Sequence, residues 1–470
     1  MTGTELLRKV ETLRWNLPRN FHDRLSESVY GEANRIAAKR TFRAGTSTRI
    51  AWQRTVDRIL TNPWTGFPVM ALIFTLVLWM TIAGANVPSG MLYTLLIENG
   101  HGLLKGLAAD IGMWSWLSGF LIDGIYLTCG WVISVMLPPM AIFFPLFTLL
   151  EDLGYLPRVA FNMDHLFQKA GAHGKQSLTM TMGLGCNAAG VIAARVIDSP
   201  RERLIAIITN NFSLCNGRWP TQIMIAVIFL GALVPPALAS FTAALAVVSV
   251  AGLGFALAFA SSWLLSRTVL KGEASAFSLE LPPYRPPKIL RTLYTSLIDR
   301  TLFVLWRAIV FAVPAGAAIW LISNIQISNH SIAWWMVTGL DPVAWLLGLT
   351  GVILVAYIVA IPANEIVIPT ILMLTVHMTG LTGVGEQGAG VMFETDENSI
   401  LRQILLAGGW TTLTAICLML FSLCHNPCST TIYTIYKETK SAKWTVVATF
   451  MPIVIGVVLC AGVALVWRLF

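Results

Sequence analysis

Long apolar stretches alternate with short polar loops along most of the chain. Eight stretches carry almost no charge and approach or exceed twenty residues: 67–85, 125–150, 219–235, 237–266, 302–323, 343–362, 400–423 and 444–467. A helix needs about 20 predominantly apolar residues to cross a bilayer. The pattern therefore predicts an all-α, polytopic bundle of transmembrane helices.

Composition and charge support a membrane protein and argue against other classes. The 470 residues are 56% hydrophobic and 12% charged, whereas soluble domains are about 25% charged. The net charge of +8 does not indicate a nucleic-acid partner, because the basic residues cluster in particular loops. Residues 1–60 contain no apolar segment, which excludes a cleaved secretory peptide. None of the seven cysteines has the paired spacing of a secreted disulfide framework.

The distribution of Lys and Arg predicts the orientation in the membrane. Residues 1–58 carry twelve of them, and 267–300 and 437–443 are also basic. The loops 85–123, 324–342 and 380–399 are nearly free of basic residues. Since cytoplasmic loops are enriched in Lys and Arg, we expect a cytoplasmic N-terminus and an external C-terminus.

Two segments have both ends on one side of the membrane under this assignment. Residues 178–198 start and end in basic, cytoplasmic loops, and 343–378 start and end outside. Each is expected to form a hairpin or re-entrant pair with its turn at membrane depth. Such irregular backbone is tolerated there only when protein buries it or it lines a polar cavity.

A short internal repeat suggests a relation between the two halves. The tetrapeptide FSLC occurs at 212–215 and at 421–424, each time after a predicted hairpin. On the predicted topology the two copies run in opposite directions across the membrane. Opposed equivalent segments with broken helices are typical of transporters built from inverted repeats.

Four helix breaks carry the polar chemistry of the apolar region. They lie at 183–187, 215–220, 361–365 and 424–428. Thiol, imidazole, amide and carboxylate groups in one place suit a borderline metal such as Fe(II), Mn(II) or Zn(II). The predicted transport path consists of Cys186, Asn187, Cys215, Asn216, Asn364, Glu365, Cys424 and Cys428.

Individual residues at the breaks have simpler alternatives. An intramembrane carboxylate is a functional candidate by default, but Glu365 would also serve as a hydrogen-bond partner of an unwound helix end. Cys424 and Cys428 are four apart and would share a helix face, with Pro427 starting that helix. The part played by Cys424 and His425 is left open. Arg218 would either pair with a carboxylate or touch substrate. Glu151, Asp152 and Arg158 follow a span on the cytoplasmic side and are expected to latch helices or to receive a regulatory signal.

Several motifs resemble those of the FeoB family of ferrous iron transporters. They are TLLEDLGYLPRVAFNMDHL at 148–166, GLGCNAAGVIAAR at 183–195, SPRERL at 199–204, ELPPYRPP at 280–287, PANEIVIP at 362–369 and CHNPCSTT at 424–431, all in family order. The resemblance covers roughly residues 50–470. It implies a Gate-type fold in a bacterial cytoplasmic membrane, with Cys186, Cys215 and Cys428 lining an ion path. Two membrane halves are expected at 61–270 and 301–470, with a cytoplasmic loop at 271–300 and an amphipathic helical region at 1–60.

The chain departs from this family at its start. FeoB proteins usually begin with a guanine-nucleotide-binding domain, but no G-x-x-x-x-G-K-[ST] loop is present here. This chain is expected not to bind or hydrolyse GTP, and the resemblance implies a separately encoded GTPase and a small SH3-like protein as partners. Residues 22–58 resemble the linker helix, with Leu25, Val29 and Ile36 on one face. That face would dock a partner or lie on the anionic inner leaflet.

The sequence thus predicts a non-enzymatic importer of Fe(II) that holds no permanent cofactor. Two other functions are retained: a Gate-type nucleoside or organic-solute carrier, and a membrane scaffold that transports nothing. The metal, the energy source and a homo-oligomeric state are left open.

Overall fold

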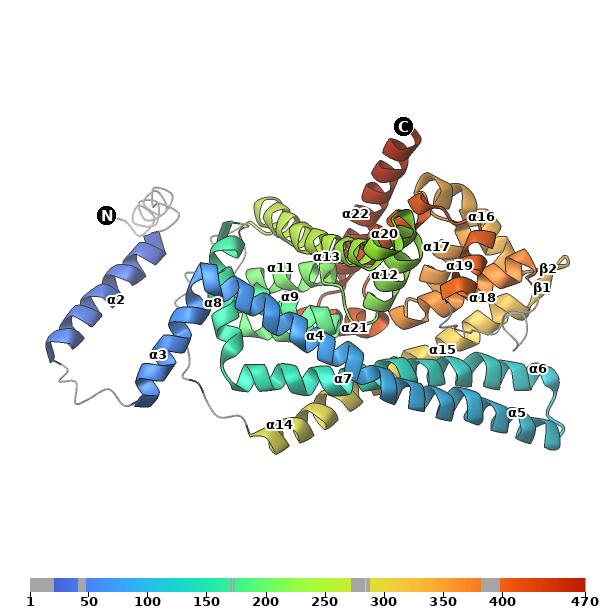
Figure 1. Ribbon diagram of the computed structural model, residues 1–470, viewed down its shortest axis with the longest axis horizontal. Helices are drawn as coiled ribbons and strands as arrows, with labels where there is room; N and C mark the ends of the chain where they lie inside the picture. The colour runs from blue at the N-terminus through green and yellow to red at the C-terminus, as the bar shows by residue number, and fades with distance from the viewer. Residues whose placement is uncertain are drawn as a thin grey trace, which may run out of the picture.

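The computed structural model describes residues 21–40, 48–169, 171, 174–271, 284, 288–381 and 398–469. Nearly all of them are helical (Figure 1). The exception is a small antiparallel hairpin of β1 (Gln326–Ile327) and β2 (His330–Ser331). The all-α prediction is confirmed.

Six helical runs in the described ranges are long and apolar enough to cross a membrane: Trp64–Asp110, Ser115–Asp152, Leu238–Arg267, Ile289–Asn324, Thr412–Thr439 and Ala442–Leu469. A bent pair, α16 (Ile332–Leu346) and α17 (Gly351–Val359), would make a seventh span. The first run has 47 residues, roughly 70 Å at 1.5 Å per residue. It is therefore more than twice as long as the hydrocarbon core is thick.

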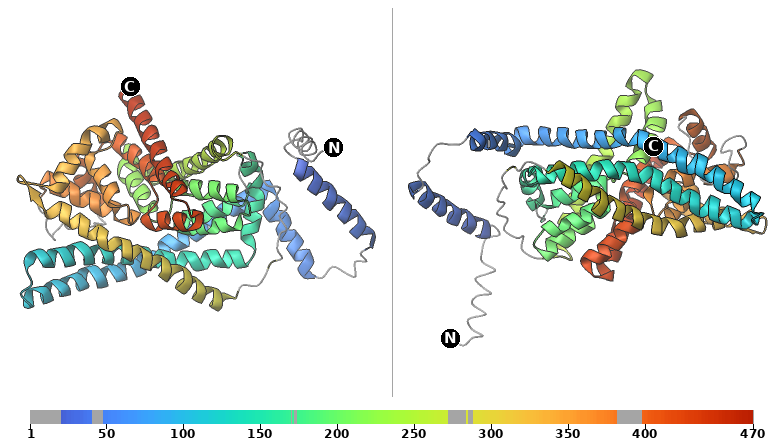
Figure 2. Two further views of the ribbon diagram at one scale, coloured as in Figure 1. Left: turned by 180° about the vertical axis from the view of Figure 1, so that it is seen from behind. Right: turned by 90° about the horizontal axis from the view of Figure 1, so that it is seen from below.

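The first long helices lie side by side in all views (Figures 1 and 2). α4 (Pro63–Tyr93) continues through a π-helical segment, η1 (Thr94–Gly100), into α5 (His101–Asp110). The chain returns through α6 (Ser115–Ser118), η2 (Gly119–Tyr126) and α7 (Leu127–Asp152). Asn62 caps α4 by accepting a hydrogen bond from the Trp64 amide, and Pro63 occupies the first turn, where it needs no partner.

The remaining helices fall into two series along the chain. The first comprises α8 (Tyr155–Lys169), α9 (Gln176–Gly185), α10 (Asn187–Ala193), η3 (Ala194–Val196), α11 (Pro200–Thr209), η4 (Asn210–Phe212), α12 (Trp219–Ile225), η5 (Ala226–Leu230), η6 (Gly231–Leu233) and α13 (Pro236–Arg267). The second comprises α14 (Ile289–Thr295), η7 (Ser296–Leu302), α15 (Phe303–Asn324), α16, α17, η8 (Asn364–Ile366), α18 (Val367–Thr379), α19 (Asn398–Ala407), α20 (Thr412–Cys424), α21 (Ser429–Thr439) and α22 (Ala442–Leu469).

Two predicted spans are interrupted in the structure. The stretch 400–423 is divided between α19 and α20 by a turn at 408–411, where Gly409 adopts φ 77°. The stretch 343–362 is bent by 111° between α16 and α17. Gly348 has φ 69° there, a conformation that glycine adopts without steric cost. Neither turn was predicted.

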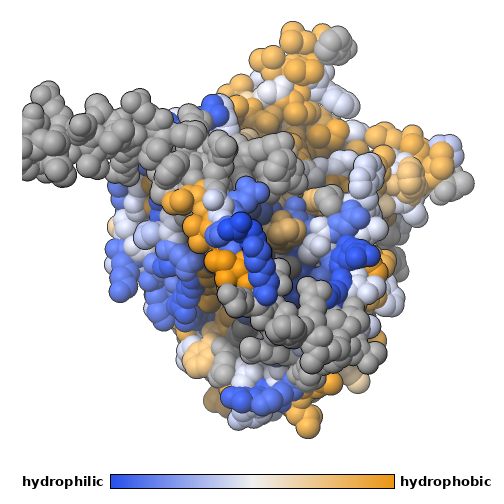
Figure 3. Space-filling model, turned by 90° about the vertical axis from the view of Figure 1, so that its left-hand side faces the viewer, coloured by the Kyte–Doolittle hydropathy of each residue, from blue (hydrophilic) through white to orange (hydrophobic). Residues whose placement is uncertain are grey.

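The N-terminal region forms two helices instead of one. α2 (Phe21–Arg40) and α3 (Thr48–Thr61) are separate, and α2 lies apart from the other helices (Figure 1). Leu25, Val29 and Ile36 are all about half exposed. Hydrophilic residues gather on the same end of the molecule (Figure 3). The exposed apolar positions are compatible with both predicted roles of this region.

A cluster at this end joins α3 to the membrane helices. Arg158, which is 1% exposed, donates to Asp57 (3.1 Å) and to the Gly154 carbonyl (2.6 Å). The Tyr284 hydroxyl also donates to Asp57 (2.8 Å), and its ring lies 4.2 Å from the guanidinium. Burial and the bond to Asp57 raise the pKa of Tyr284 to about 12, so the hydroxyl keeps its proton at neutral pH.

These contacts agree with a latch role for the acidic motif at 151–158. Asp152 accepts a hydrogen bond from Thr292 of α14 (2.7 Å), and Glu151 is exposed. Apart from Tyr284, the motif 280–287 is mostly outside the described residues.

Replacing Tyr284 by phenylalanine tests this latch. The variant loses the bond to Asp57 but keeps the ring over Arg158, so the free energy of unfolding should fall by about 1 kcal/mol. Thermal unfolding in detergent measures the loss, with Tyr294→Phe at an exposed tyrosine as control. Equal unfolding midpoints for the two variants would contradict the latch.

Candidate functional site

The first helix break is a single extended residue between two short helices. Cys186 ends α9 and precedes α10 with φ −151° and ψ 121°. The side-chain amide of Asn187 is placed in the orientation that satisfies both its oxygen and its nitrogen. Its nitrogen then donates to the carbonyls of Gly183 (3.0 Å) and Ser213 (3.2 Å). Asn187 therefore pairs a backbone carbonyl beside the break, which an interrupted helix requires.

The third break repeats this geometry. Ala363 has φ −151° and ψ 123° and is followed by Asn364, as Cys186 is followed by Asn187. In each half, a glycine lies twelve residues before the extended position. Its backbone amide donates to the side chain of an aspartate that lies ten residues before the glycine. The pairs are Gly174 with Asp164 (3.0 Å) and Gly351 with Asp341 (2.7 Å). The sequence predicts that the breaks at 183–187 and 361–365 are counterparts in opposite-facing halves, and the matching backbone agrees with that prediction. The Asp–Gly pairs are a further correspondence that the sequence analysis did not identify.

The second and fourth breaks do not match each other as the FSLC repeat suggested. The first FSLC is largely non-helical, whereas the second forms the last turn of α20. Cys424 ends α20 and Cys428 is the N-cap of α21, with non-helical residues between them. The two cysteines therefore do not share a helix face. Pro427 does not start α21, which begins at Ser429.

Hydrogen bonds connect all four breaks, although they come from distant parts of the sequence. The Asn216 amide donates to the Gly185 carbonyl (3.1 Å), which joins the second break to the first. The Asn364 side chain contacts the Cys215 thiol (3.8 Å), which joins the third to the second. The Ser429 amide donates to the Ile361 carbonyl (2.9 Å), which joins the fourth to the third.

Arg218 connects the second break to the fourth. It is 2% exposed, and its guanidinium donates to the carbonyls of Leu423 (3.1 Å), His425 (2.9 Å) and Asn426 (3.1 Å). It also donates to the carbonyl (3.1 Å) and side chain (3.3 Å) of Asn211. A cation beside the last carbonyls of α20 is favourable because that helix end carries partial negative charge. No carboxylate forms an ion pair with Arg218 within the described residues.

Four ligand-type side chains come together around this junction. The thiols of Cys186, Cys215 and Cys428 lie close enough together for a charge on one to affect the others, and Cys215 and Cys428 are in the same relation to Glu365. All four side chains are partly exposed. In the part of the chain that the structure describes, no three His, Cys, Asp or Glu residues are arranged to hold a metal ion. The arrangement offers single ligands near one another but no set of ligands that would enclose a metal ion.

Cys424, a predicted path residue, and His425, whose part was left open, are both buried. Cys424 is completely buried and packs against Gly456 of α22. His425 is 4% exposed, and its ring packs 4.5 Å from that of Tyr357. Sequence reasoning missed Asn210 and Asn211, which bond to the Asn187 and His425 carbonyls (2.8 and 2.7 Å). Two adjacent amides before FSLC were a signal that could have indicated them.

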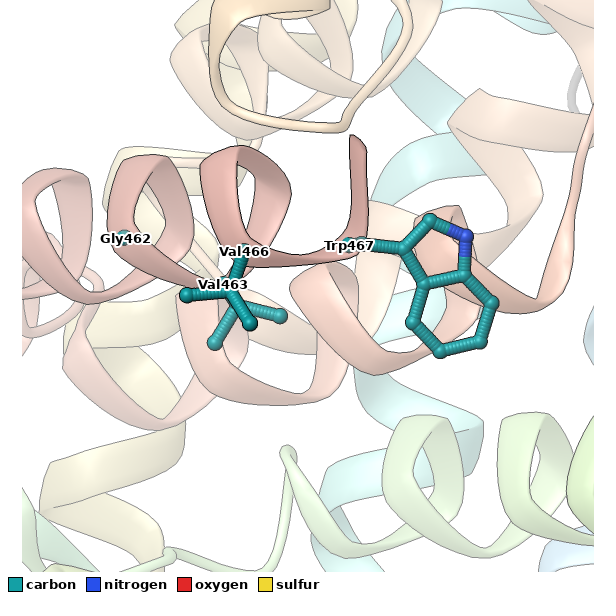
Figure 4. Close-up of a pocket in the computed structure, with 4 residues that line it drawn as sticks. All are labelled: Gly462, Val463, Val466 and Trp467. Atoms are coloured by element: carbon teal, nitrogen blue, oxygen red, sulfur yellow. The ribbon is translucent and has the colours of Figure 1, made fainter. Parts of the chain in front are cut away.

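Two cavities differ sharply in chemistry. One of about 960 Å³ lies between α4, α7 and α12, and Asn216 and Glu365 from the breaks line it. The other, of about 580 Å³, is lined by Gly462, Val463, Val466 and Trp467 at the end of α22 (Figure 4). The second cavity has no ionisable side chain in its lining and does not suit a cation.

Comparisons with known proteins agree with this architecture. The Gate family, described as "Nucleoside recognition", matches residues 133–230 and 305–442, and "Ferrous iron transport protein B C terminus" matches 247–299. The Fe(2+) transporter FeoB of Staphylococcus aureus (strain MSSA476) is 29% identical over 86% of this chain. That of Salmonella typhimurium (strain LT2) is 32% identical over 57% of this chain. No solved structure gives a significant match.

The matches cover only part of these relatives. The aligned region spans 57% of the Staphylococcus protein and 33% of the Salmonella protein. The Gate segments include all four breaks, and the C-terminal segment includes most of α13 and α14. This chain is a multi-pass membrane protein that belongs to the FeoB family and corresponds to its membrane region.

Proposed function

We propose that this protein imports divalent metal, Fe(II) above all, through the junction of the four helix breaks. One observation carries the proposal. Three partly exposed thiols and one carboxylate, from four segments far apart in sequence, converge inside a membrane protein. Charged side chains at membrane depth are costly and mark ion pathways.

The ligand types suit a borderline metal that must keep moving. Thiolates favour softer ions such as Fe(II) and Zn(II), and carboxylate and amide oxygens favour harder ones. Cys186, Cys215 and Cys428 would be transient ligands, and Glu365, Asn364, Asn187 and Asn216 would supply oxygens. Conduction requires binding that is weak and spread over several sites. An arrangement without a closed cage meets this requirement.

The halves 61–270 and 301–470 are proposed to be inverted repeats. The equal geometry at Cys186 and Ala363, and the equal spacing of the Asp–Gly pairs before them, support a common unit. The Gate match in two segments supports it as well. Broken helices at the interface of inverted repeats are where transporters bind substrate.

The surroundings of the protein are part of the proposal. The basic N-terminal region would face the bacterial cytoplasm and the C-terminus would lie outside, with 271–300 as a cytoplasmic loop. A separately encoded GTPase and a small SH3-like protein are the proposed partners, and α2 and α3 offer a surface for them. No chemical reaction is assigned to the chain.

Gly217 offers a test of the position of Glu365. A Cβ atom built at Gly217 collides with the Glu365 carboxylate, so Gly217→Ala should displace the carboxylate. Overpacking typically costs about 1–3 kcal/mol, and we expect Fe(II) uptake by proteoliposomes to fall about tenfold. Gly252→Ala is the control, since a Cβ there meets nothing within 4 Å. Unchanged uptake in Gly217→Ala would contradict the placement of Glu365.

The Gate description, "Nucleoside recognition", keeps a nucleoside carrier as the second candidate. Purified chain in liposomes should admit Fe(II) but not uridine, with and without a candidate soluble GTPase. Entry of uridine without Fe(II) would reverse the assignment, and entry of neither under both conditions would favour a scaffold.

A further inference from the structure

The cavity between α4, α7 and α12 contains polar groups that the four breaks do not explain. α4 lies outside both Gate segments, yet it lines the cavity with Asn86, Ser89 and Tyr93. These positions are three and four residues apart and so share one face of the helix. Val87 and Met91 lie on another face and are 69% and 70% exposed, as expected of side chains in contact with lipid.

α7, which packs against α4, also lines the cavity and adds further oxygen atoms. Ser134 and Val135 line the cavity, and Pro138 and Pro139 follow them by four residues within the helix. A proline has no N–H to donate to the carbonyl four residues before it. The carbonyls of Ser134 and Val135 thus lack their usual helical partners at the cavity wall.

The carboxylate of the third break lines the cavity. Glu365 and Asn216 line it, whereas Cys186, Cys215 and Cys428 do not. Glu365 interacts with its own backbone amide and with the charge of Arg218. The buried Nε1 of Trp219, which also lines the cavity, has no hydrogen-bond partner within the described residues. The same is true of the buried Oδ1 of Asn364, the residue that precedes Glu365 in the chain. Unsatisfied buried polar atoms of this kind indicate that water or an ion completes the site.

We propose that this cavity is a water-filled vestibule in which oxygen atoms from α4 and α7 receive a hydrated divalent cation. This inference rests on the proposed function and adds the order in which the cation meets its ligands. The cation exchanges water for amide, hydroxyl and carbonyl oxygens, meets Glu365, and only then reaches the thiols. Hard oxygen donors do not favour softer divalent ions, so selection for softer ions falls to the thiols.

Thiol accessibility tests the vestibule in the full chain reconstituted in liposomes. Ser89→Cys is compared with Val87→Cys on the same helix, and the reaction of the unmodified chain is subtracted. A cationic methanethiosulfonate reagent is applied from each side in turn. The Ser89→Cys thiol should react about tenfold faster than the Val87→Cys thiol from one side, because a thiolate forms in water and not in lipid. If the Ser89→Cys and Val87→Cys thiols react at the same rate from either side, the vestibule is ruled out.

Mn(II) is the probe for the cation. It should slow the labelling of Ser89→Cys, and slow it less when Glu365→Gln is added. Labelling that Mn(II) does not affect would overturn the cation assignment. The proposed function is tested by a different result. If Mn(II) protects Ser89→Cys from labelling but the protein carries no Fe(II), the vestibule is supported and the transport function is contradicted.

Discussion

Glu365→Gln is expected to reduce Fe(II) flux on the order of 100-fold while the protein stays folded. Glutamine keeps the shape of the side chain and removes the negative charge that faces the cavity. Two unit charges 4 Å apart interact by about 4 kcal/mol at an effective dielectric constant near 20, and about 1.4 kcal/mol corresponds to a factor of ten. A 100-fold loss of flux corresponds to about 2.8 kcal/mol, which is only part of the interaction between the cation and the carboxylate.

Flux and stability should respond in opposite ways to this change. A neutral side chain is cheaper to hold in a membrane than a carboxylate, so the thermal unfolding midpoint of Glu365→Gln should be equal or higher. Glu98→Gln, at an exposed carboxylate in η1, is the matched control and should transport normally. A lower midpoint together with unchanged flux would assign Glu365 a structural role only.

Arg218→Leu is expected to give the largest loss of stability in the membrane region. The wild-type guanidinium donates to carbonyls of Leu423, His425 and Asn426, more than 200 residues away in sequence. Leucine leaves these oxygens and those of Asn211 without the donor, and each buried unsatisfied group costs about 1–3 kcal/mol. We expect a total of at least about 3 kcal/mol, read as a large fall in the unfolding midpoint in detergent.

The conservative variant separates geometry from charge at this position. Arg218→Lys keeps the charge but has three donors on one nitrogen, which do not reproduce the planar fork of arginine. It should recover only part of the lost stability. Arg267→Lys, at an exposed arginine at the end of α13, is the control. Full stability in Arg218→Lys would show that charge alone matters at the junction.

Local sequence signals predicted the breaks well and their contacts poorly. Glycine, proline and amides inside apolar runs indicated all four interruptions, because such residues weaken helices wherever they occur. The partners of Arg218 depend on how distant helices pack, and local sequence does not specify them. For the same reason the pairing of Asp57, Arg158 and Tyr284 was missed.

The internal repeat shows where a sequence match misleads. FSLC occurs twice but takes two conformations, because each copy follows a different helix and meets different neighbours. The backbone at Cys186 and Ala363 matches closely although the residues differ. An extended residue followed by asparagine occurs at both positions, with cysteine in one case and alanine in the other.

The central claim is that metal passes the thiols at the junction of the breaks. Fe(II) entry into liposomes containing the purified chain, compared between the unmodified protein and the double variant Cys186→Ser, Cys428→Ser, tests it most directly. Cys129→Ser in α7, a partly buried thiol outside the junction, is the control. We predict that entry in the double variant falls to the level of protein-free liposomes while the control transports normally. Undiminished Fe(II) entry in the double variant would contradict the account.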